Sequence, residues 1–228
     1  MGEPRGFTVL WCGEVSTARG RLAALRDVCP PEAVTAVGPR PGKAVDPLLT
    51  GRVLVVGADA DLAAVALRLL RRNLLSTVDL AYATTDRTAV TRLHGLPTGP
   101  AAVRLAEAGA AAAVPLVRDD VGGVLLGLGE IGPIVRGTVY VDERRVLRGP
   151  AAALHVRPDP AKGLAVTVVQ PRVAGVFGPR PRTTLGRAVQ IGMAPTNVRL
   201  DGREHPRPMD RWTFYRHTEP LRLVRPAR

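Results

Sequence analysis

The sequence predicts an α/β N-terminal half built on a parallel sheet, followed by an all-β sandwich. In residues 1–110, short β-branched runs alternate with segments of helical period, which is the pattern of a parallel α/β sheet. From residue 111 onward, apolar runs are separated by Gly, Pro and charged residues, and no convincing helical period occurs. We therefore expect an α/β domain over residues 1–110 and a β-sandwich domain over residues 111–228.

The α/β half is organised around residues 52–72, RVLVVGADADLAAVALRLLRR. Residues 53–56 form a β-branched run typical of a buried strand, and residues 62–71 place their apolar side chains at helical spacing. The turn between them, Gly57 to Asp61, lies where open α/β sheets bind ligands. Asp59 or Asp61 can also cap the helix by accepting from its N-terminal N–H groups, and this simpler role stays open.

Further strands and helices are expected on both sides of this unit. Helices are expected to begin at Ser16 or Thr17, at Thr88, and at Pro100, where Thr98 can supply the cap. Residues 38–47 are rich in Pro and Gly and predict a loop. The expected segments are strands 7–12, 33–37 and 77–83, and helices 16–27, 88–94 and 100–108.

The second half contains many short strands, which is typical of an antiparallel sandwich or barrel. Residues 139–146 predict a hairpin, and residues 173–184 predict a loop rich in Gly, Pro and Arg. The expected strands cover residues 112–117, 123–128, 138–141, 145–147, 152–156, 164–169, 186–191, 197–200 and 221–224.

Charge is the most unusual feature of the composition. The chain of 228 residues has a net charge of +12, carried almost entirely by arginine, and residues 171–228 contain 12 arginines against 4 acidic residues. Ala, Arg, Gly, Pro and Val dominate together, as in GC-rich genomes, so we give the high pI little weight as evidence for nucleic acid. The basic C-terminal quarter suits an anionic partner, which could be an anionic lipid or membrane surface, a nucleic acid or a nucleotide, but a solvated arginine-rich surface explains it as simply.

Cysteine usage and hydropathy indicate a cytoplasmic protein. Cys12 and Cys29 form no disulfide framework and no metal-ligand spacing, so both are expected to be buried small hydrophobes in a reducing compartment. The four histidines share no ligand spacing, and no metal site is expected. No apolar stretch approaches the ~20 residues of a membrane span, so membrane contact would be peripheral. A protein partner and a homo-oligomer stay open.

Three stretches carry a resemblance to a known family. They are Gly57-Ala58-Asp59-Ala60-Asp61 after the third expected strand, residues 85–97 (TDRTAVTRLHGLP) after the fourth, and VRLDGRE at 198–204 with LRLVRP at 221–226. In order and spacing they resemble the diacylglycerol kinase family, which is related more distantly to NAD kinases. That family has Gly-Gly-Asp-Gly-Thr, then Gly-Thr-Gly-Asn with an Arg and Gly-Leu-Pro, then an Asp-Gly-Glu turn before a strand ending in Pro.

The resemblance implies a set of site residues. The two loops would contact nucleotide, and the last turn would serve the phosphoryl acceptor through Asp201 and Glu204. ATP and Mg²⁺ are implied as cofactors only if the chain is active, and Mg²⁺ could then lie among Asp59, Asp61 and Asp86. The implied nucleotide contacts are Gly57, Ala58, Asp59, Ala60, Thr85, Arg87 and Arg92.

The departures from the family pattern bear directly on activity. Glycine loops bind phosphate because bare backbone N–H groups can approach it closely, and Ala58 and Ala60 add methyl groups at two such places. Asp61 adds a carboxylate where the family has a neutral hydroxyl, and like charges ~4 Å apart repel by about 1 kcal/mol in water and by more in a sheltered site. Arg203 replaces the glutamate of the last turn, and Glu204 lies one residue beyond it.

Two functions follow from this comparison. The first is a degenerate diacylglycerol kinase-like protein without catalysis, which binds an anionic ligand or partner through the inherited cleft or a basic sandwich face. The alternative is an active ATP-dependent lipid kinase that transfers the γ-phosphoryl group to a lipid hydroxyl. A nucleic-acid role is the least expected.

Simpler structural roles compete with the implied ones. Asp201 and Gly202 are also what a plain hairpin turn contains. Trp212, Phe214 and Tyr215 lie among arginines and could stack bases or meet lipid, but the scarcity of aromatic residues favours a place in the sandwich core.

Overall fold

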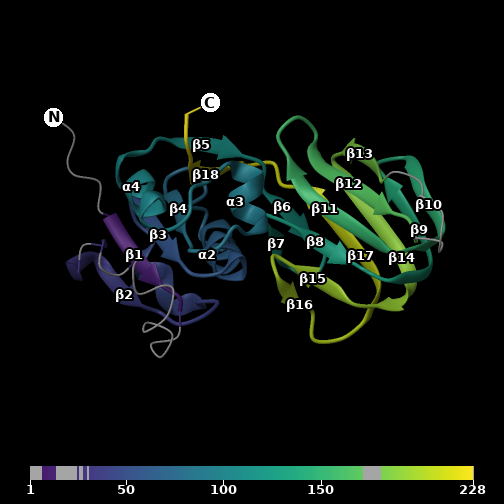
Figure 1. Ribbon diagram of the computed structural model, residues 1–228, viewed down its shortest axis with the longest axis horizontal. Coiled ribbons are helices and arrows are strands. Elements are labelled where there is room, and N and C mark those ends of the chain that lie inside the picture. Colours follow the sequence, from purple (N-terminus) through teal and green to yellow (C-terminus); the bar gives the residue numbers. More distant parts are fainter. Residues whose placement is uncertain (1–6, 14–24, 26–27, 30, 172–180, 228) are drawn as a thin grey trace. The chain divides into compact units, whose positions relative to one another are not determined.

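The computed structural model describes residues 7–13, 25, 28–29, 31–171 and 181–227. The chain forms two compact units, which are treated separately here (Figure 1). Unit 1 comprises residues 1–114 together with 219–228, and unit 2 comprises residues 115–218. Most of the helix expected over residues 16–27 and most of the loop expected over residues 173–184 lie outside the described residues. Residues 182–184 were predicted as loop but belong to a strand, so that part of the prediction is wrong.

Unit 1 is built on a six-stranded sheet with the order β2-β1-β3-β4-β18-β5. The strands from β2 to β18 are parallel, and β5 is antiparallel to β18. Every residue of β4 is buried, as expected for a strand covered on both faces. The bounds are β1 Phe7–Trp11, β2 Val34–Ala36, β3 Arg52–Val56, β4 Asp79–Ala83, β5 Ala111–Val114 and β18 Leu221–Val224.

The described helices of unit 1 agree with the expected ones in place, with differences at their ends. Helix α2 (Asp59–Arg71) begins three residues before the expected start, and α4 (Pro100–Ala108) is preceded by Gly99 rather than capped by Thr98. Helix α3 (Ala89–His94) starts one residue after the expected start, and the Thr88 hydroxyl caps it. Two 3₁₀ helices, η2 (Pro31–Ala33) and η3 (Lys43–Leu48), were not predicted, and η3 begins within the expected loop at 38–47.

The last strand joins a different sheet from the one that the sequence suggested. Residues 221–224 were expected in the β-rich half, but β18 pairs with β4 and β5 in unit 1. The buried Asp79 carboxylate holds it there, at 2.7 Å from Arg222 Nε and 3.5 Å from an Arg52 guanidinium nitrogen. Local strand patterns carry no information about a partner 143 residues away, so this pairing was not predictable from periodicity.

Unit 2 consists of two six-stranded sheets whose described strand pairs are antiparallel, so the predicted β-rich second half is confirmed. One sheet has the order β10-β9-β14-β17-β6-β7 and the other β13-β12-β11-β8-β15-β16. The first contains β6 Val117–Asp119, β7 Val124–Leu125, β9 Ile134–Val141, β10 Arg144–Ala151, β14 Ala188–Thr196 and β17 Met209–Arg216. The second contains β8 Gly129–Ile131, β11 Ala153–Asp159, β12 Gly163–Val169, β13 Arg182–Gly186, β15 Val198–Leu200 and β16 Arg203–Glu204.

Side chains from both sheets form the core of unit 2. Trp212 and Phe214 of β17 are fully buried in it, beside residues such as Leu154 and Val166 of the opposite sheet. The core interpretation is therefore confirmed for Trp212 and Phe214. It is wrong for Tyr215, which is only half-buried and absent from this core, because side chains alternate between the two faces along β17. The hairpin predicted over residues 139–146 is also present, with Arg144 paired to Val141.

Both cysteines are buried, as predicted. Cys12 is 1% exposed and Cys29 is 3% exposed. Burial raises the pKa of the Cys12 thiol to about 12, with a further contribution from the Asp61 carboxylate. Burial likewise raises the pKa of Cys29 to about 11, so both groups stay protonated at neutral pH and are poor nucleophiles. No helix among the described residues has the length and apolar character needed to span a bilayer.

An ion pair between Asp46 and Arg68 is expected to make the stability of unit 1 depend on pH. Arg68 donates to both carboxylate oxygens, from Nε at 2.8 Å and from Nη2 at 2.6 Å. The hydrogen bond from Arg68 lowers the pKa of Asp46 below its ordinary value of 3.8. A lowered folded-state pKa stabilises the fold above the unfolded-state pKa, and this contribution is lost as the pH falls through the folded-state value.

The test compares the wild type with Asp46→Asn by urea unfolding from pH 7 to pH 2. We expect a constant stability difference above about pH 5 and a shrinking one below about pH 4, near the ordinary aspartate pKa. A difference that stays constant down to pH 2 would contradict a role for the charged pair.

Candidate phosphate-binding turn and acceptor turn

The turn after β3 is closely packed and depends on a glycine. A Cβ atom at Gly57 would collide with the Asp61 carboxylate and lie 3.0 Å from the Cβ of Cys12. The N–H of Gly57 donates to the carbonyl of Ala83 at 3.2 Å, which ties the turn to the end of β4. The strand, turn and helix predicted around residues 52–72 are therefore present, and their tight turn has little room above Gly57.

The Asp61 carboxylate turns back onto the loop that precedes it. Its Oδ2 accepts from the backbone N–H of Ala58 at 2.8 Å, and its Oδ1 accepts from the backbone N–H of Arg40 at 2.7 Å. The residue is only 5% exposed. Asp61 therefore occupies backbone donors of the kind that a glycine loop would present to a phosphate group.

The Asp59 carboxylate is buried as well, and it faces β4 and α3. Its Oδ1 accepts from the Tyr82 hydroxyl at 2.9 Å, and its Oδ2 accepts from the backbone N–H of Val90 at 3.1 Å. Burial and the Asp59 carboxylate raise the pKa of Tyr82 far above its ordinary value, so the hydroxyl remains a donor. The structure thus brings the first turn, β4 and the first turn of α3 together through Asp59.

Asp59 is not the N-cap of α2, so that simpler interpretation is wrong. The N-cap is Ala58, which has no side-chain acceptor, and Asp59 is the first helical residue. Asp61 performs part of the capping task instead, because its carboxylate accepts from the Ala58 N–H. Both aspartates also place negative charge in the first turn, where the helix dipole favours it.

In the second stretch, residues 85–97, the Arg92 side chain donates to nearby backbone carbonyls. Arg92 donates from Nε to the Thr88 carbonyl at 3.0 Å and from Nη2 to the Arg87 carbonyl at 2.6 Å. Thr85 is half-buried, whereas Asp86 and Arg87 are exposed. Of the two arginines implied as nucleotide contacts, Arg92 donates to backbone carbonyls of the same segment, and Arg87 is exposed.

The described carboxylates of this region do not assemble a metal site. Within the part of the chain that the structure describes, no group of three or more His, Cys, Asp or Glu side chains could hold a metal ion. The magnesium arrangement that the kinase alternative implied for Asp59, Asp61 and Asp86 would need Asp59 and Asp61 to leave their present hydrogen bonds.

Asp201, one of the two predicted catalytic residues, lies in unit 2 and is 2% exposed. Its Oδ1 accepts from the N–H groups of Gly127 at 2.7 Å and Leu128 at 3.0 Å, and its Oδ2 accepts from that of Leu126 at 2.9 Å. The residue has a positive φ of 48°, which aspartate tolerates better than most residues. Its carboxylate therefore anchors residues 126–128 to the turn between β15 and β16.

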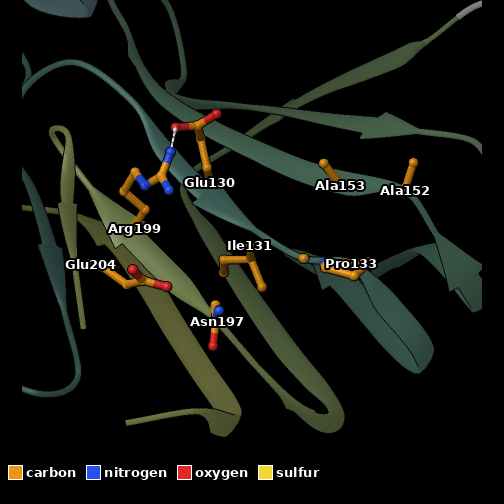
Figure 2. A pocket seen from close by; sticks show the side chains of 9 residues that line it. Glu130, Ile131, Pro133, Ala152, Ala153, Asn197, Arg199 and Glu204 are labelled. Carbon is orange, nitrogen blue, oxygen red and sulfur yellow. Dashed lines mark ion pairs between the residues drawn. The ribbon is translucent and has the colours of Figure 1, made fainter. Parts of the chain in front are cut away.

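Glu204, the other predicted catalytic residue, is exposed and lines a pocket of about 240 Å³ in unit 2 (Figure 2). Asp201 is not among the lining residues, so the two predicted catalytic side chains do not meet in this pocket. Glu130 lies across it, 3.9 Å from an Arg199 guanidinium nitrogen. The lining residues are Glu130, Ile131, Gly132, Pro133, Ala152, Ala153, Asn197, Arg199 and Glu204.

Sequence reasoning missed the donors that hold the aspartates in place. Tyr82 lies in a strand whose five residues are all buried, and a buried tyrosine hydroxyl needs a hydrogen-bond partner, so Tyr82 itself was the available signal. Arg40 and Val90 act through backbone N–H groups, which no side-chain pattern reports. Glu130 and the pocket around it also went unrecognised, because they depend on the pairing of β8 with β15.

Comparisons with solved structures identify the fold. A putative diacylglycerol kinase from Bacillus anthracis str. Sterne matches with a TM-score of 0.70 and 10% identity over 99% of each chain. An NAD kinase from Archaeoglobus fulgidus, solved in complex with ATP, matches with a TM-score of 0.59 and 14% identity over 96% of this chain and 93% of that one. A yeast NADH kinase complexed with NADH matches with a TM-score of 0.61 and 7% identity over 97% of this chain and 84% of that one.

These matches define a chain with the diacylglycerol kinase and NAD kinase-like fold, as the sequence motifs predicted. No protein-family model matches the sequence, and no curated protein matches it either. The resemblance is therefore one of fold, and it covers the whole length of the chain.

Proposed function

We propose that this chain is a catalytically silent member of the kinase-like fold that binds an anionic ligand or partner. The observation that carries the proposal is the Asp61 carboxylate, which accepts from the backbone N–H groups of Ala58 and Arg40. A phosphate group at this turn would compete with an internal anion for the same donors. The two negative charges would also repel each other in a sheltered environment, where Coulomb energies exceed their value in water several-fold.

Two further observations support the proposal. The Asp59 carboxylate is engaged by Tyr82 and Val90, so presenting it to a nucleotide or metal would leave a buried hydroxyl and a buried N–H without their acceptor. The Asp201 carboxylate is engaged by three backbone N–H groups. Phosphoryl transfer depends on charged groups that are positioned to contact the reacting phosphate. The carboxylates of Asp59 and Asp201 are instead held by hydrogen bonds within the protein.

The active lipid kinase remains the competing candidate, and the fold itself favours it. ATP-dependent phosphorylation of diacylglycerol that falls with Asp59→Asn would replace the proposal with this alternative. That substitution keeps the side chain's shape while removing its charge.

Restoring the family's turn is expected to create a nucleotide response that the native chain lacks. The variant Ala58→Gly/Ala60→Gly/Asp61→Thr rebuilds Gly-Gly-Asp-Gly-Thr, which removes the internal anion and two methyl groups. A ligand present at 100 times its Kd stabilises a protein by about 2.7 kcal/mol, which raises the Tm of a chain of this size by roughly 5–10 °C. We expect such a shift with millimolar Mg-ATP for the variant and none for the wild type, measured by differential scanning fluorimetry.

Two partial variants separate the effect of the added charge from the effect of the added methyl groups. Asp61→Thr alone removes the charge, and Ala58→Gly/Ala60→Gly alone removes the methyl groups. A clear Mg-ATP shift in the wild type would overturn the silent assignment. If the triple variant folds by circular dichroism but gives no shift, the altered turn is not what prevents binding.

A further inference from the structure

One outer face of unit 2 is basic across its whole width. In the sheet β10-β9-β14-β17-β6, residues such as Val139, Ile191 and Trp212 point into the core, so their neighbours along each strand point outward. Strand register aligns these outward residues in three rows. The rows are Arg148–Thr138–Gly192–Arg211, Arg145–Tyr140–Gln190–Thr213, and Ala188–Tyr215–Arg118. We call these eleven positions the arginine–tyrosine face.

The charge of this face is one-sided. The rows contain four arginines and no Asp or Glu. Two aspartates at its margin are engaged by backbone N–H groups, Asp120 by Thr213 at 3.1 Å and Asp142 by Ala188 at 2.9 Å. Both aspartates keep their charge, but four arginines outnumber them, so the face is net positive.

The opposite sheet of unit 2 has a different outer face. Its register aligns acidic and basic side chains in one row, with Glu130 between Arg199 and His155 and with Glu204 beside Arg199. Glu130 lies 3.9 Å from Arg199 and 4.0 Å from His155. Charge in that row is paired, which distinguishes it from the rows of the arginine–tyrosine face, where the arginines have no acidic neighbour in register.

Both tyrosines of the face lie directly across from an arginine. Tyr215 is paired with Arg118, whose Cζ lies 5.6 Å from the ring centroid, within the range of a cation–π contact. Tyr140 is paired with Arg145 and is 38% exposed, although it is a large side chain. Tyrosine combines an apolar ring with a polar hydroxyl and is enriched where proteins meet the membrane–water interface.

We propose that the arginine–tyrosine face binds the surface of an anionic phospholipid bilayer. The inference rests on the proposed role of the chain in binding an anionic partner and names that partner. The arginines of the arginine–tyrosine face are spread in two dimensions. Within one row, Arg148 and Arg211 are separated by three strand intervals, or ~14 Å, and the uncharged Thr138 and Gly192 lie between them. A planar array of phosphate groups can meet charges spread this way, whereas a single nucleic acid strand offers phosphates along a line.

Vesicle flotation tests the proposal. We expect the wild type to bind vesicles of phosphatidylcholine mixed with phosphatidylglycerol at low salt, and to be released by high salt or when phosphatidylglycerol is omitted. Each arginine near an anionic surface contributes about fivefold to partitioning, so Arg145→Gln/Arg148→Gln/Arg211→Gln should weaken binding by about 10²-fold.

A matched variant controls for net charge. Arg157→Gln/Arg182→Gln/Arg199→Gln removes the same charge from exposed arginines of the opposite sheet and should change binding by about twofold at most. Equal losses in the two variants would overturn the proposal, because they would show that net charge rather than this face drives binding. Equal binding to neutral vesicles would also overturn it.

A single-stranded oligonucleotide serves as the competing partner. If the oligonucleotide binds and the mixed vesicles do not, with binding lost in the Arg145/Arg148/Arg211 variant, the face recognises nucleic acid and the lipid proposal is wrong. If the wild type binds no vesicles and also shows no response to Mg-ATP, the proposal of a membrane partner is wrong. The proposal that the chain is catalytically silent would still stand.

Discussion

Replacing Asp201 with alanine is expected to destabilise unit 2 by on the order of 3–4 kcal/mol. The substitution would leave the backbone N–H groups of Leu126, Gly127 and Leu128 without their acceptor, and a buried group that loses its partner costs about 1–3 kcal/mol. It would also place alanine at a positive φ of 48°. Guanidinium chloride unfolding, followed by the fluorescence of the buried Trp212, measures the change.

Asp142 provides a matched control for this prediction. It too has a positive φ, of 50°, and its carboxylate accepts from the backbone N–H groups of Arg187 and Ala188, but it is exposed. Water can replace its acceptor, so Asp142→Ala should cost about 1 kcal/mol or less. Equal costs for the two substitutions would contradict a buried anchoring role for Asp201.

The Asp201 result also bears on catalysis. A carboxylate that serves as a catalytic base can be replaced with little loss of stability, whereas an anchoring carboxylate cannot. Asp201→Asn keeps one carbonyl oxygen as an acceptor and tolerates the positive φ, so its cost should be intermediate.

Replacing Asp79 with alanine is expected to destabilise unit 1 by about 3 kcal/mol. Removing one partner of a buried ion pair costs about 3–5 kcal/mol, and the lower end applies because Arg222 is 37% exposed. Asp79 joins Arg52 of β3 to Arg222 of β18, so its loss should loosen the last strand first. Hydrogen exchange at the amides of residues 221–224 measures this loosening directly.

A double-mutant cycle separates the ion pair from other effects of the substitution. Arg222→Gln alone should cost less than Asp79→Ala, because its side chain is partly solvated. Asp79→Ala combined with Arg222→Gln should then cost less than the sum of the two single changes. Strict additivity would show that the two side chains do not stabilise each other.

Local sequence signals predicted those parts of the fold that local physics controls. Thr88 and Gly95 mark the two ends of α3 as expected, with the Thr88 hydroxyl accepting from Thr91 and Gly95 in the left-handed region at a φ of 67°. The hairpin that turns at Asp142 and Glu143 was predicted on the same grounds. In these cases the interacting groups lie within a few residues of one another.

The roles of the candidate site residues could not be predicted in this way. The sequence placed Asp59, Asp61 and Asp201 at turns, which suits capping, phosphate binding and catalysis alike. Apart from the Ala58 N–H, which lies three residues from Asp61, the donors that decide between these roles are distant in sequence. They lie 21 to 31 residues away for Asp61 and Asp59, and 73 to 75 residues away for Asp201. Most of these donors are backbone N–H groups, which every residue except proline carries and no sequence pattern distinguishes.

By itself, the sequence determined the alternation of strands and helices in the first half, the β-rich character of the second half and, through three motifs, the kinase-like fold. It did not reveal β8 or β17, which were absent from the expected strands. Only the tertiary structure decided that β18 completes the sheet of unit 1 and that the carboxylates of both candidate turns are already engaged. It also decided that four arginines of β6, β10 and β17 share one face. The physical reason is the same in each case: strand pairing and buried hydrogen bonds join groups far apart in the chain, and periodicity reports only neighbours.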